Sequence, residues 1–512
     1  SILMRRSYME KIGIIDLGSN SARLVLVNVH EGGYFAVFDE LKESVRLAQG
    51  VDEDGVLSPA RVEQTIKTLQ MFRRLCDSNK VSRIYAYATA AVRNAKNQLS
   101  FLAEVQLKCG FKLEILDDEQ EAQMVYQGVI NSMDIPRGLI MDIGGGSTQL
   151  IYYNRKNILG HATIPYGAVT LTEKFRTVTY RPQERAEMIK AFFMEELEKI
   201  EFLNEMEPDV RFIGVGGSFR NVGKISRMIR KYPLNMLHNY VVPNNEFNSI
   251  YNNIKSLDLD KTMKIKGLSS VRADIFPSAL AAVSAVFEKF SFNDVVISGC
   301  GLREGAMFKI AVPSTNDKPI SDVLGHSLYT TLNFYQENIG HAEQVYNLSV
   351  QLFKQLRVLH KLPRSYVKVL RVAAMLHDTG NKIKYYDHHK HSAYIILHSN
   401  LYGISHKDLV MSAMVASMHR KGELDASTFM KYRDMITEED LYAVLKLGVI
   451  VRIAESLDRS MDSVIKEINC DVLGDSVIMK TESVSDCSLE IKNALAATSE
   501  FKKHFNKNLQ IL

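Results

Sequence analysis

Two loops rich in glycine and hydroxyl side chains carry the clearest chemical signal in the sequence. Asp16-Leu-Gly-Ser-Asn-Ser21 and Asp142-Ile-Gly-Gly-Gly-Ser-Thr148 each follow a short apolar run. Glycine lets backbone N–H groups turn toward an anion, and serine and threonine add hydroxyl donors. The aspartate repels phosphate, so it suits a divalent cation or a water molecule. One such loop is common at a strand end, but two matched loops predict a cleft that holds phosphate from both sides.

A cluster of acidic residues lies between the two loops. Asp117-Asp-Glu-Gln-Glu121 opens an expected helix. Negative charge is favoured at the N-terminus of a helix, so these residues could simply cap it. Alternatively, one of them is a general base that activates water for attack on phosphorus. The residues alone leave both interpretations open.

Several arginines are candidates for phosphate binding, because a guanidinium group matches phosphate oxygens in bidentate geometry. Arg46 and Arg93 are two of them, although each also suits a solvated helix start. Arg303 is a third, although it can pair with the adjacent Glu304. Residues 220–231 hold five basic side chains directly after a Gly-Gly-Ser loop. Such a run is usually a solvated helix face, but it also suits a track for a long polyanion.

The second half of the chain contains an ordered series of histidines and aspartates on expected helices. Imidazole and carboxylate groups together bind divalent metals, and a two-metal site is conceivable. The alternative is a helical dimerisation domain whose histidines lie on the surface and in the core. His388, His389 and His398 add further candidates. The metal-binding set favoured by the order of the residues is His341, His377, Asp378, His391, His419 and Asp458.

The elements that must position these residues follow a pattern that starts twice. Apolar alternation predicts a strand meander over 11–38, a helix from Pro59 to about Cys76, a strand at 84–88, a helix at 97–109, a strand at 113–116 and a helix at 119–130. The pattern restarts with strands at 138–143, 148–153 and 158–164, a helix at 183–204, and strands at 211–215 and 295–298. The restart predicts a duplicated α/β unit with a cleft between the copies.

The remaining chain is expected to be helical and then mixed. Residues 312–319, rich in proline and polar side chains, are the expected linker. A helical pattern is expected to about Met461. A strand expected at 477–480 and a helix expected at 488–505 indicate a small α+β segment at the end. The predicted domains are therefore 1–132 and 133–312 (the two α/β lobes), 320–462 (all-helical) and 463–512 (α+β).

Composition describes an ordinary globular protein. The 512 residues exceed what a single core can organise, and 63 basic against 59 acidic residues give a net charge of +4. This balance calls for no nucleic-acid partner. Five scattered cysteines without C-x-x-C spacing suggest reduced thiols and a cytoplasmic location. Residues 1–9 do not form a signal peptide, and no apolar run is long enough to span a membrane.

The motifs together resemble those of the exopolyphosphatase / guanosine-pentaphosphate phosphatase family over about residues 10–310. The resemblance rests on both glycine-rich loops, Val45-Arg-Leu47, Thr89 to Arg93, Glu121-Ala122, Gly216-Gly-Ser218 and Leu302-Arg-Glu-Gly305. It implies two ribonuclease-H-like lobes of the actin-like ATPase superfamily. The second half resembles an all-α HD-type domain, in the version that is appended to longer exopolyphosphatases.

The resemblance also implies a role for each residue. Glu121 is expected to be the catalytic base, with Asp142 and Arg93 as further catalytic residues and Asp16 and Asp142 as Mg²⁺ ligands. The implied substrate-binding residues are Ser19, Asn20, Ser21, Arg46, Gly144, Gly145, Gly146, Ser147, Thr148, Gly217, Ser218 and Arg303. Mg²⁺ is the expected cofactor, and K⁺ and a further divalent metal in the HD-type domain are additional candidates. A homodimer is expected from the resemblance alone.

One departure from the family pattern concerns the second loop. Gln149 stands where the family usually has glutamate, which weakens the expected metal site. The expected activity is Mg²⁺-dependent release of terminal orthophosphate from inorganic polyphosphate by water that Glu121 activates. The alternatives are hydrolysis of the 5′ phosphate of guanosine pentaphosphate, a kinase or ATP-driven chaperone with the same fold, and a non-catalytic polyphosphate or alarmone sensor.

Overall fold

The structure, a computed structural model, describes residues 9–512 except 52, 156 and 336. The chain divides into two compact units, one up to Ser321 and one over Asp322–Leu512. This boundary lies just beyond the expected linker, and the finer division into four domains remains a prediction. Among the described helices, none combines the length and the apolar character needed to cross a membrane.

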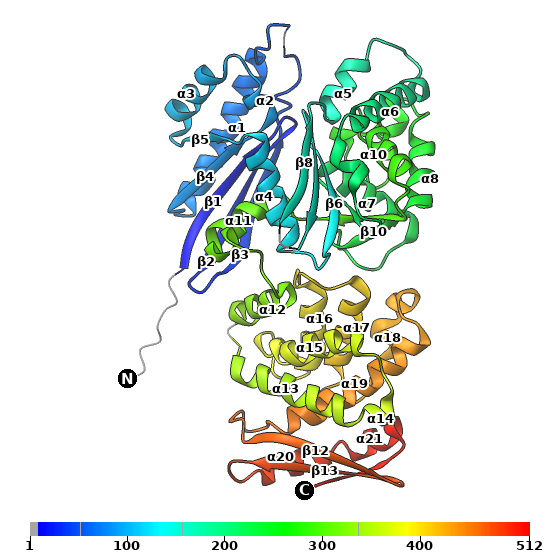
Figure 1. Cartoon of the computed structure of the whole chain (residues 1–512). Helices are drawn as coiled ribbons and strands as arrows, with labels where there is room; N and C mark the ends of the chain where they lie inside the picture. The colour runs from blue at the N-terminus through cyan, green and yellow to red at the C-terminus, as the bar shows by residue number, and fades with distance from the viewer. Residues whose placement is uncertain (1–8, 52, 156, 336) are drawn as a thin grey trace. The chain divides into compact units, whose positions relative to one another are not determined.

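The first unit begins with a five-stranded mixed sheet (Figure 1). Its strand order is β3-β2-β1-β4-β5, with β1 antiparallel to β2 and parallel to β4. The strands are β1 (Met9–Leu17), β2 (Ser21–His30), β3 (Tyr34–Ser44), β4 (Arg83–Ala88) and β5 (Leu113–Ile115). Its helices are α1 (Pro59–Ser78), α2 (Ala90–Arg93), α3 (Gln98–Cys109) and α4 (Asp118–Ile130).

A second mixed sheet repeats this arrangement. Its order is β10-β11-β9-β6-β7-β8. Strand β6 is antiparallel to its hairpin partner β7 and parallel to β9, as β1 is to β2 and β4 in the first sheet. The strands are β6 (Arg137–Ile143), β7 (Thr148–Asn154), β8 (Ile158–Ile164), β9 (Arg211–Val215), β10 (Tyr240–Pro243) and β11 (Asp294–Ser298). The predicted duplication is therefore confirmed, and the added edge strand β10 is the main difference between the copies.

Helices cover the second sheet and one of them reaches back to the first. They are α5 (Ala168–Phe175), α6 (Pro182–Glu198), α7 (Gly217–Arg230), α8 (Asn244–Ile254), α9 (Leu259–Thr262), α10 (Phe276–Phe290) and α11 (Leu302–Ala311). The helix expected over 183–204 ends earlier, and a separate 3-10 turn covers Glu201–Glu205. Helix α11 packs against α4 and the strands of the first sheet, so the first lobe is completed by residues far along the chain (Figure 1).

Glycines permit the close approach of α11 and α4. A Cβ atom at Gly128 would lie 2.1 Å from the carbonyl oxygen of Gly301, and one at Gly305 would lie 1.8 Å from that of Met124. Both distances are far inside van der Waals contact, so the two backbones pack directly on one another. This contact fixes the helix that carries Glu121 relative to the loop before α11.

The second unit is mainly helical and ends in a small sheet. Its helices are α12 (Val323–Phe334), α13 (Ile339–Gln355), α14 (Arg357–His360), α15 (Val367–Leu376), α16 (His388–His398), α17 (His406–Ser417), α18 (Ala426–Phe429), α19 (Glu438–Ser456), α20 (Ser488–Leu495) and α21 (Thr498–Phe505). The sheet has the order β12-β13-β14, from Ile465–Leu473, Ser476–Ser483 and Asn508–Ile511. The sequence predicted only the middle strand, and the helix expected over 488–505 is two helices.

Candidate active site

The two glycine-rich loops have the same internal geometry. In the first, the Gly18 amide donates to the Ser21 carbonyl at 3.0 Å, and in the second, the Gly144 amide donates to the Ser147 carbonyl at 2.9 Å. Each loop joins the inner strand of its sheet, β1 or β6, to the next strand of a hairpin. The repeated motif in the sequence is therefore a repeated structure.

The two loops also touch each other. A Cβ atom at Gly145 would lie 2.9 Å from the Asn20 amide nitrogen, and one at Gly146 would lie 2.6 Å from the Ser19 hydroxyl. Only glycine allows this proximity. Both loops consequently line one cavity in the first unit, as predicted from their pairing.

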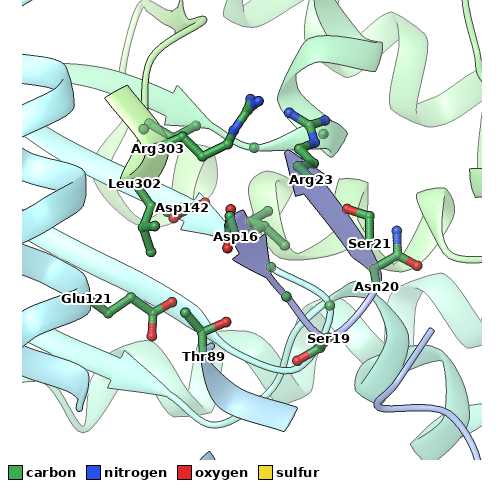
Figure 2. A pocket seen from close by; sticks show the side chains of 18 of the residues that line it. Asp16, Ser19, Asn20, Ser21, Arg23, Thr89, Glu121, Asp142, Leu302 and Arg303 are labelled. Carbon is green, nitrogen blue, oxygen red and sulfur yellow. The ribbon is translucent and has the colours of Figure 1, made fainter. Parts of the chain in front are cut away.

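Four carboxylates line this cavity, and besides Glu304 they are Asp16, Asp142 and Glu121, which come from three different elements (Figure 2). Asp16 ends β1, Asp142 lies near the end of β6, and Glu121 lies in the first turn of α4. Burial raises the pKa of Asp16, and burial together with the charge of Asp16 raises the pKa of Asp142 to about 6. Two buried aspartates close enough for the charge of Asp16 to raise the pKa of Asp142 form a donor set that a divalent cation would stabilise.

Glu121 is almost completely buried, with 7% of its surface exposed. Burial raises its pKa to about 7, although the Arg93 charge and hydrogen bond act in the opposite direction. The helix cap is a different residue: Asp117 accepts from the Gln120 amide at 2.8 Å, and the Gln120 side chain accepts from the Asp117 amide. Capping thus accounts for Asp117 and leaves Glu121 to face the cavity.

Arg93 contacts the acids of α4 instead of lining the cavity. Its guanidinium donates to Glu121 at 2.9 Å, forms an ion pair with Asp118 at 2.9 Å and donates to the Leu116 carbonyl at 2.8 Å. Arg93 is not among the cavity-lining residues. The structure therefore places Arg93 beside Glu121, and its expected contact with the terminal phosphoryl group stays a prediction.

Four other arginines line the cavity, and three of them were not among the expected site residues. Arg303 was expected, whereas Arg23, Arg220 and Arg272 were missed. Burial lowers the pKa of Arg23 to about 9 and that of Arg272 to about 10, and in both cases the charge of Arg220 adds to the effect. Such mutual repulsion in a buried cluster indicates a site for an anion. Arg23 follows the first loop by only two residues, and Arg220 begins the basic run, so both had a signal in the sequence.

Three expected substrate-binding residues lie outside the cavity lining. Arg46 is held by a bidentate pair with Asp274, at 2.5 and 2.7 Å, beside a separate pocket. Thr148 is buried and donates to the Tyr166 carbonyl, so its hydroxyl stabilises the loop. Ser218 is also buried and accepts from Arg272 at 3.1 Å, behind the lining residue Gly217. The remaining expected contacts line the cavity, namely Ser19, Asn20, Ser21, Gly144, Gly145, Gly146, Ser147, Gly217 and Arg303.

Gln149 lies directly beneath the second loop. It is paired with Asp142 across the β6–β7 ladder, which places the two side chains on the same face of the sheet. Its carbonyl oxygen lies 2.7 Å from the His161 ring and 3.1 Å from the Thr163 hydroxyl. The buried amide nitrogen has no hydrogen-bond partner among the described residues. The amide is thus adjacent to Asp142, although Gln149 does not line the cavity.

The histidines of the second unit form a separate buried cluster. Asp378 lies among His341, His377, His388 and His419, and the candidate ligand atoms fall into two groups that share Asp378. His391, which the sequence favoured, is in neither group, and His388 occupies the place expected for it. Asp458 is also in neither group, because it accepts a hydrogen bond from His341 at 2.7 Å. The order of residues located the cluster, and the metal-binding roles of His391 and Asp458 stay predictions.

Comparisons with known proteins agree with this architecture. Residues 25–312 match the Ppx/GppA phosphatase family, and residues 326–502 match domain III of Ppx/GppA phosphatases. A protein of Pseudoalteromonas atlantica named guanosine-5'-triphosphate,3'-diphosphate pyrophosphatase is 30% identical over 77% of this chain and 76% of its own. A Vibrio vulnificus protein of the same name is 28% identical over 80% of each chain.

Solved structures show the same fold for the first unit. The Aquifex aeolicus member of the Ppx/GppA family superposes with a TM-score of 0.52 at 26% identity, over 60% of this chain and 99% of that one. An exopolyphosphatase from Cytophaga hutchinsonii superposes with a TM-score of 0.55 at 24% identity, over 59% and 98% of the two chains. The two lobes therefore have the actin-like fold of these structures. The chain belongs to the Ppx/GppA phosphatase family, whose members hydrolyse phosphoric anhydrides.

Proposed function

We propose that this protein releases terminal orthophosphate from inorganic polyphosphate with the help of Mg²⁺. The observation that carries the proposal is the juxtaposition, in one cavity, of a buried carboxylate of raised pKa and four arginines. Water attack on a terminal phosphoryl group needs a base on one side and positive charge around the phosphoryl oxygens. Both parts are supplied by side chains of this chain.

Glu121 is the proposed general base. A pKa of about 7 lets a carboxylate hold a proton taken from water and release it again near neutral pH. Arg93 fixes the orientation of the carboxylate through its hydrogen bond of 2.9 Å. The proton of the attacking water passes to Glu121, and the oxygen forms the new bond to phosphorus as the bond to the leaving chain breaks.

Arginines and loop donors bind the phosphates. Arg23, Arg220, Arg272 and Arg303 offer charge-assisted donors to the phosphoryl oxygens, and the two glycine-rich loops place hydroxyl and backbone groups beside them. Figure 2 shows Arg23 and Arg303 across the cavity from Glu121. In this proposal the terminal phosphoryl group binds between the base and the positive charge.

The paired aspartates fit the expected magnesium ion. Asp16 and Asp142 are hard oxygen donors whose mutual repulsion a cation removes. When bound, Mg²⁺ would neutralise charge on the phosphate oxygens. Asp16 and Asp142 would hold the ion, and Glu121 remains the proposed base.

The lining of the cavity favours an inorganic chain over a nucleotide. None of the described residues that line it is aromatic, whereas a guanine base is commonly held by stacking. Beyond the lining, Lys42 and Lys224 extend the positive charge. Burial lowers the pKa of each lysine, and the charges of Arg23 and Arg220 lower it further, which shows that both lysines lie near these arginines. A long polyanion uses such a continuation, and a nucleotide does not require it.

Guanosine pentaphosphate is the second candidate substrate, because the curated relatives at 28–30% identity carry that activity in their names. The test is orthophosphate release from long polyphosphate and from guanosine pentaphosphate by the full chain, with and without Mg²⁺. We expect a kcat/KM at least tenfold higher for polyphosphate. A higher value for guanosine pentaphosphate reverses the assignment, and release from neither would favour a sensor.

A further inference from the structure

The loop between β11 and α11 forms one wall of the phosphate-binding cavity. Residues 298–304 all line the cavity, and Arg303 is one of them. We propose that His238 is a positioning residue for this loop, which it ties to the end of helix α4 through the two nitrogen atoms of its ring. The consequence for turnover rests on the proposed function, whereas the anchoring of the loop does not.

The backbone amides of this loop donate to side chains. The amide of Gly299 donates to Nδ1 of His238 at 3.0 Å, and the two residues are 61 positions apart in the sequence. The next two amides donate to the Ser298 hydroxyl at 3.1 Å and to the Glu304 carboxylate at 2.8 Å. These last two acceptors lie within three residues of their donors, so they set the shape of the loop. The contact with His238 joins the loop to a distant segment of the chain.

The second nitrogen of the ring contacts the end of the helix that carries Glu121. The Nε2 atom of His238 lies 2.8 Å from the carbonyl oxygen of Ser132, just beyond the C-terminus of α4. Ser132 is fully buried, and its hydroxyl donates to the Gly128 carbonyl in the last turn of α4 at 2.6 Å. The imidazole therefore bridges the cavity loop and the helix of the proposed base.

The two contacts specify one protonation state of the ring. An amide nitrogen only donates, so Nδ1 of His238 must be an unprotonated acceptor. A carbonyl oxygen only accepts, so Nε2 must carry the hydrogen. Both conditions hold in the neutral ring that is protonated on Nε2. The bond to Gly299 therefore depends on an acceptor at the Nδ1 position, and substitutions can isolate this feature.

The position of His238 follows from the added edge strand β10. This strand pairs antiparallel with β11, with Tyr240 opposite Ile297, and the Asn239 amide donates to the Ile297 carbonyl at 2.9 Å. When this register is continued by two residues, His238 lies opposite Gly299. A Cβ atom at Gly299 would lie 3.3 Å from the Cβ atom of His238, so the glycine gives the histidine room to approach. The added strand thus brings the anchor to the cavity loop.

The placement of the loop affects both the base and the phosphate donors. The carbonyl oxygen of Gly301 is the atom that a Cβ at Gly128 of α4 would meet, at 2.1 Å. Arg303 lines the cavity from the first turn of α11, directly after the loop (Figure 2). A shift of the loop would therefore move Arg303 relative to Glu121. Groups that act on one phosphoryl group must be held in accurate mutual positions, so such a shift should slow the reaction.

The test uses three substitutions in the full-length chain that separate the two contacts of the ring. Asparagine keeps an acceptor at the Nδ1 position, glutamine keeps a donor at the Nε2 position, and phenylalanine keeps a ring without either. We expect kcat/KM for orthophosphate release from polyphosphate to stay within threefold of the parent in His238→Asn. It should fall at least tenfold in His238→Gln and His238→Phe. The control is His30→Gln, at the end of β2 opposite the cavity-lining Ser21, and it should leave kcat/KM unchanged.

Amide hydrogen exchange of the loop gives a readout that does not depend on turnover. A peptide covering residues 296–304 should exchange at least fivefold faster in His238→Gln and His238→Phe than in the parent, and at the parent rate in His238→Asn. If the parent releases no orthophosphate, the proposed function fails, and exchange alone decides the role of His238. The proposal is overturned if His238→Phe exchanges as slowly as the parent. It is also overturned if His238→Asn matches His238→Gln in exchange or, with an active parent, in kcat/KM.

Discussion

The guanidinium of Arg93 donates a hydrogen bond of 2.9 Å to the carboxylate of Glu121. A residue expected to contact the substrate thus also contacts the proposed base. The ion pair with Asp118, also at 2.9 Å, and the bond to the Leu116 carbonyl hold the arginine in place. This contact makes the ionisation of Glu121 depend on Arg93, and it leads to the first two predictions.

The pH dependence of the reaction should report the raised pKa of Glu121. Burial raises this pKa to about 7, and a general base must be deprotonated to act. The value of kcat/KM should therefore rise with pH through about 7 and level off above it. The measurement is a pH profile of orthophosphate release at saturating Mg²⁺. A profile that is already flat from pH 5 upward would contradict the assignment.

Replacement of Arg93 should move this profile. The charge and hydrogen bond of Arg93 lower the pKa of Glu121, in opposition to burial, so Arg93→Gln should raise it further. The acid limb should move to higher pH by at least half a unit, and Arg93→Lys should move it less. A change in KM without a shift of the limb would instead indicate that Arg93 binds the substrate.

Restoring the family's glutamate should strengthen the magnesium site. Gln149 faces the same side of the sheet as Asp142, directly across the ladder. A carboxylate at this position adds negative charge beside a bound cation, so Gln149→Glu should lower the Mg²⁺ concentration for half-maximal activity at least threefold. The assay is a Mg²⁺ titration of activity, with Tm as the control for folding. An unchanged or higher Mg²⁺ concentration for half-maximal activity would show that the side chain at position 149 does not contribute to Mg²⁺ binding.

The contact between α4 and α11 should tolerate no added methyl group. A Cβ atom at Gly128 would lie 2.1 Å from the Gly301 carbonyl oxygen, so Gly128→Ala should cost about 1–3 kcal/mol of stability. It should also lower kcat, because α4 carries Glu121. At the control position Gly340, also in a helix, the nearest atom to a Cβ would lie 3.5 Å away. Gly340→Ala should leave stability equal or higher, and an equal loss in both variants would contradict the packing argument.

The sequence predicted the parts that local chemistry determines. The paired loops and the duplicated strand pattern follow from short motifs and from the alternation of apolar residues, and the family resemblance singled out Glu121, which faces the cavity. The sequence did not predict the contacts that depend on distant segments. Arg272 lines the cavity, although its segment of the sequence contains no motif. Arg46 does not line the cavity and instead binds Asp274, which is 228 residues away in the sequence.

The histidine cluster shows the same limit at a smaller scale. His388 and His391 are three residues apart at the start of one helix, so spacing alone could not decide which of them joins the cluster. Similarly, Asp458 has the residue type of a metal ligand, but its carboxylate contacts the Nδ1 atom of His341 and is not in either group of candidate ligands. The residue types were enough to predict a cluster of potential metal ligands. Which individual residues belong to the cluster depends on how the helices pack, and this could not be predicted from the sequence.

The most direct test of the central claim is the rate of orthophosphate release from long polyphosphate by Glu121→Gln. Glutamine has nearly the same shape and cannot accept the proton of water. General-base catalysis is worth roughly 10²–10⁴-fold, so kcat should fall at least a hundredfold, with KM changed less than threefold and the fold retained by circular dichroism. A variant that keeps more than a tenth of the parent kcat would show that Glu121 is not the base.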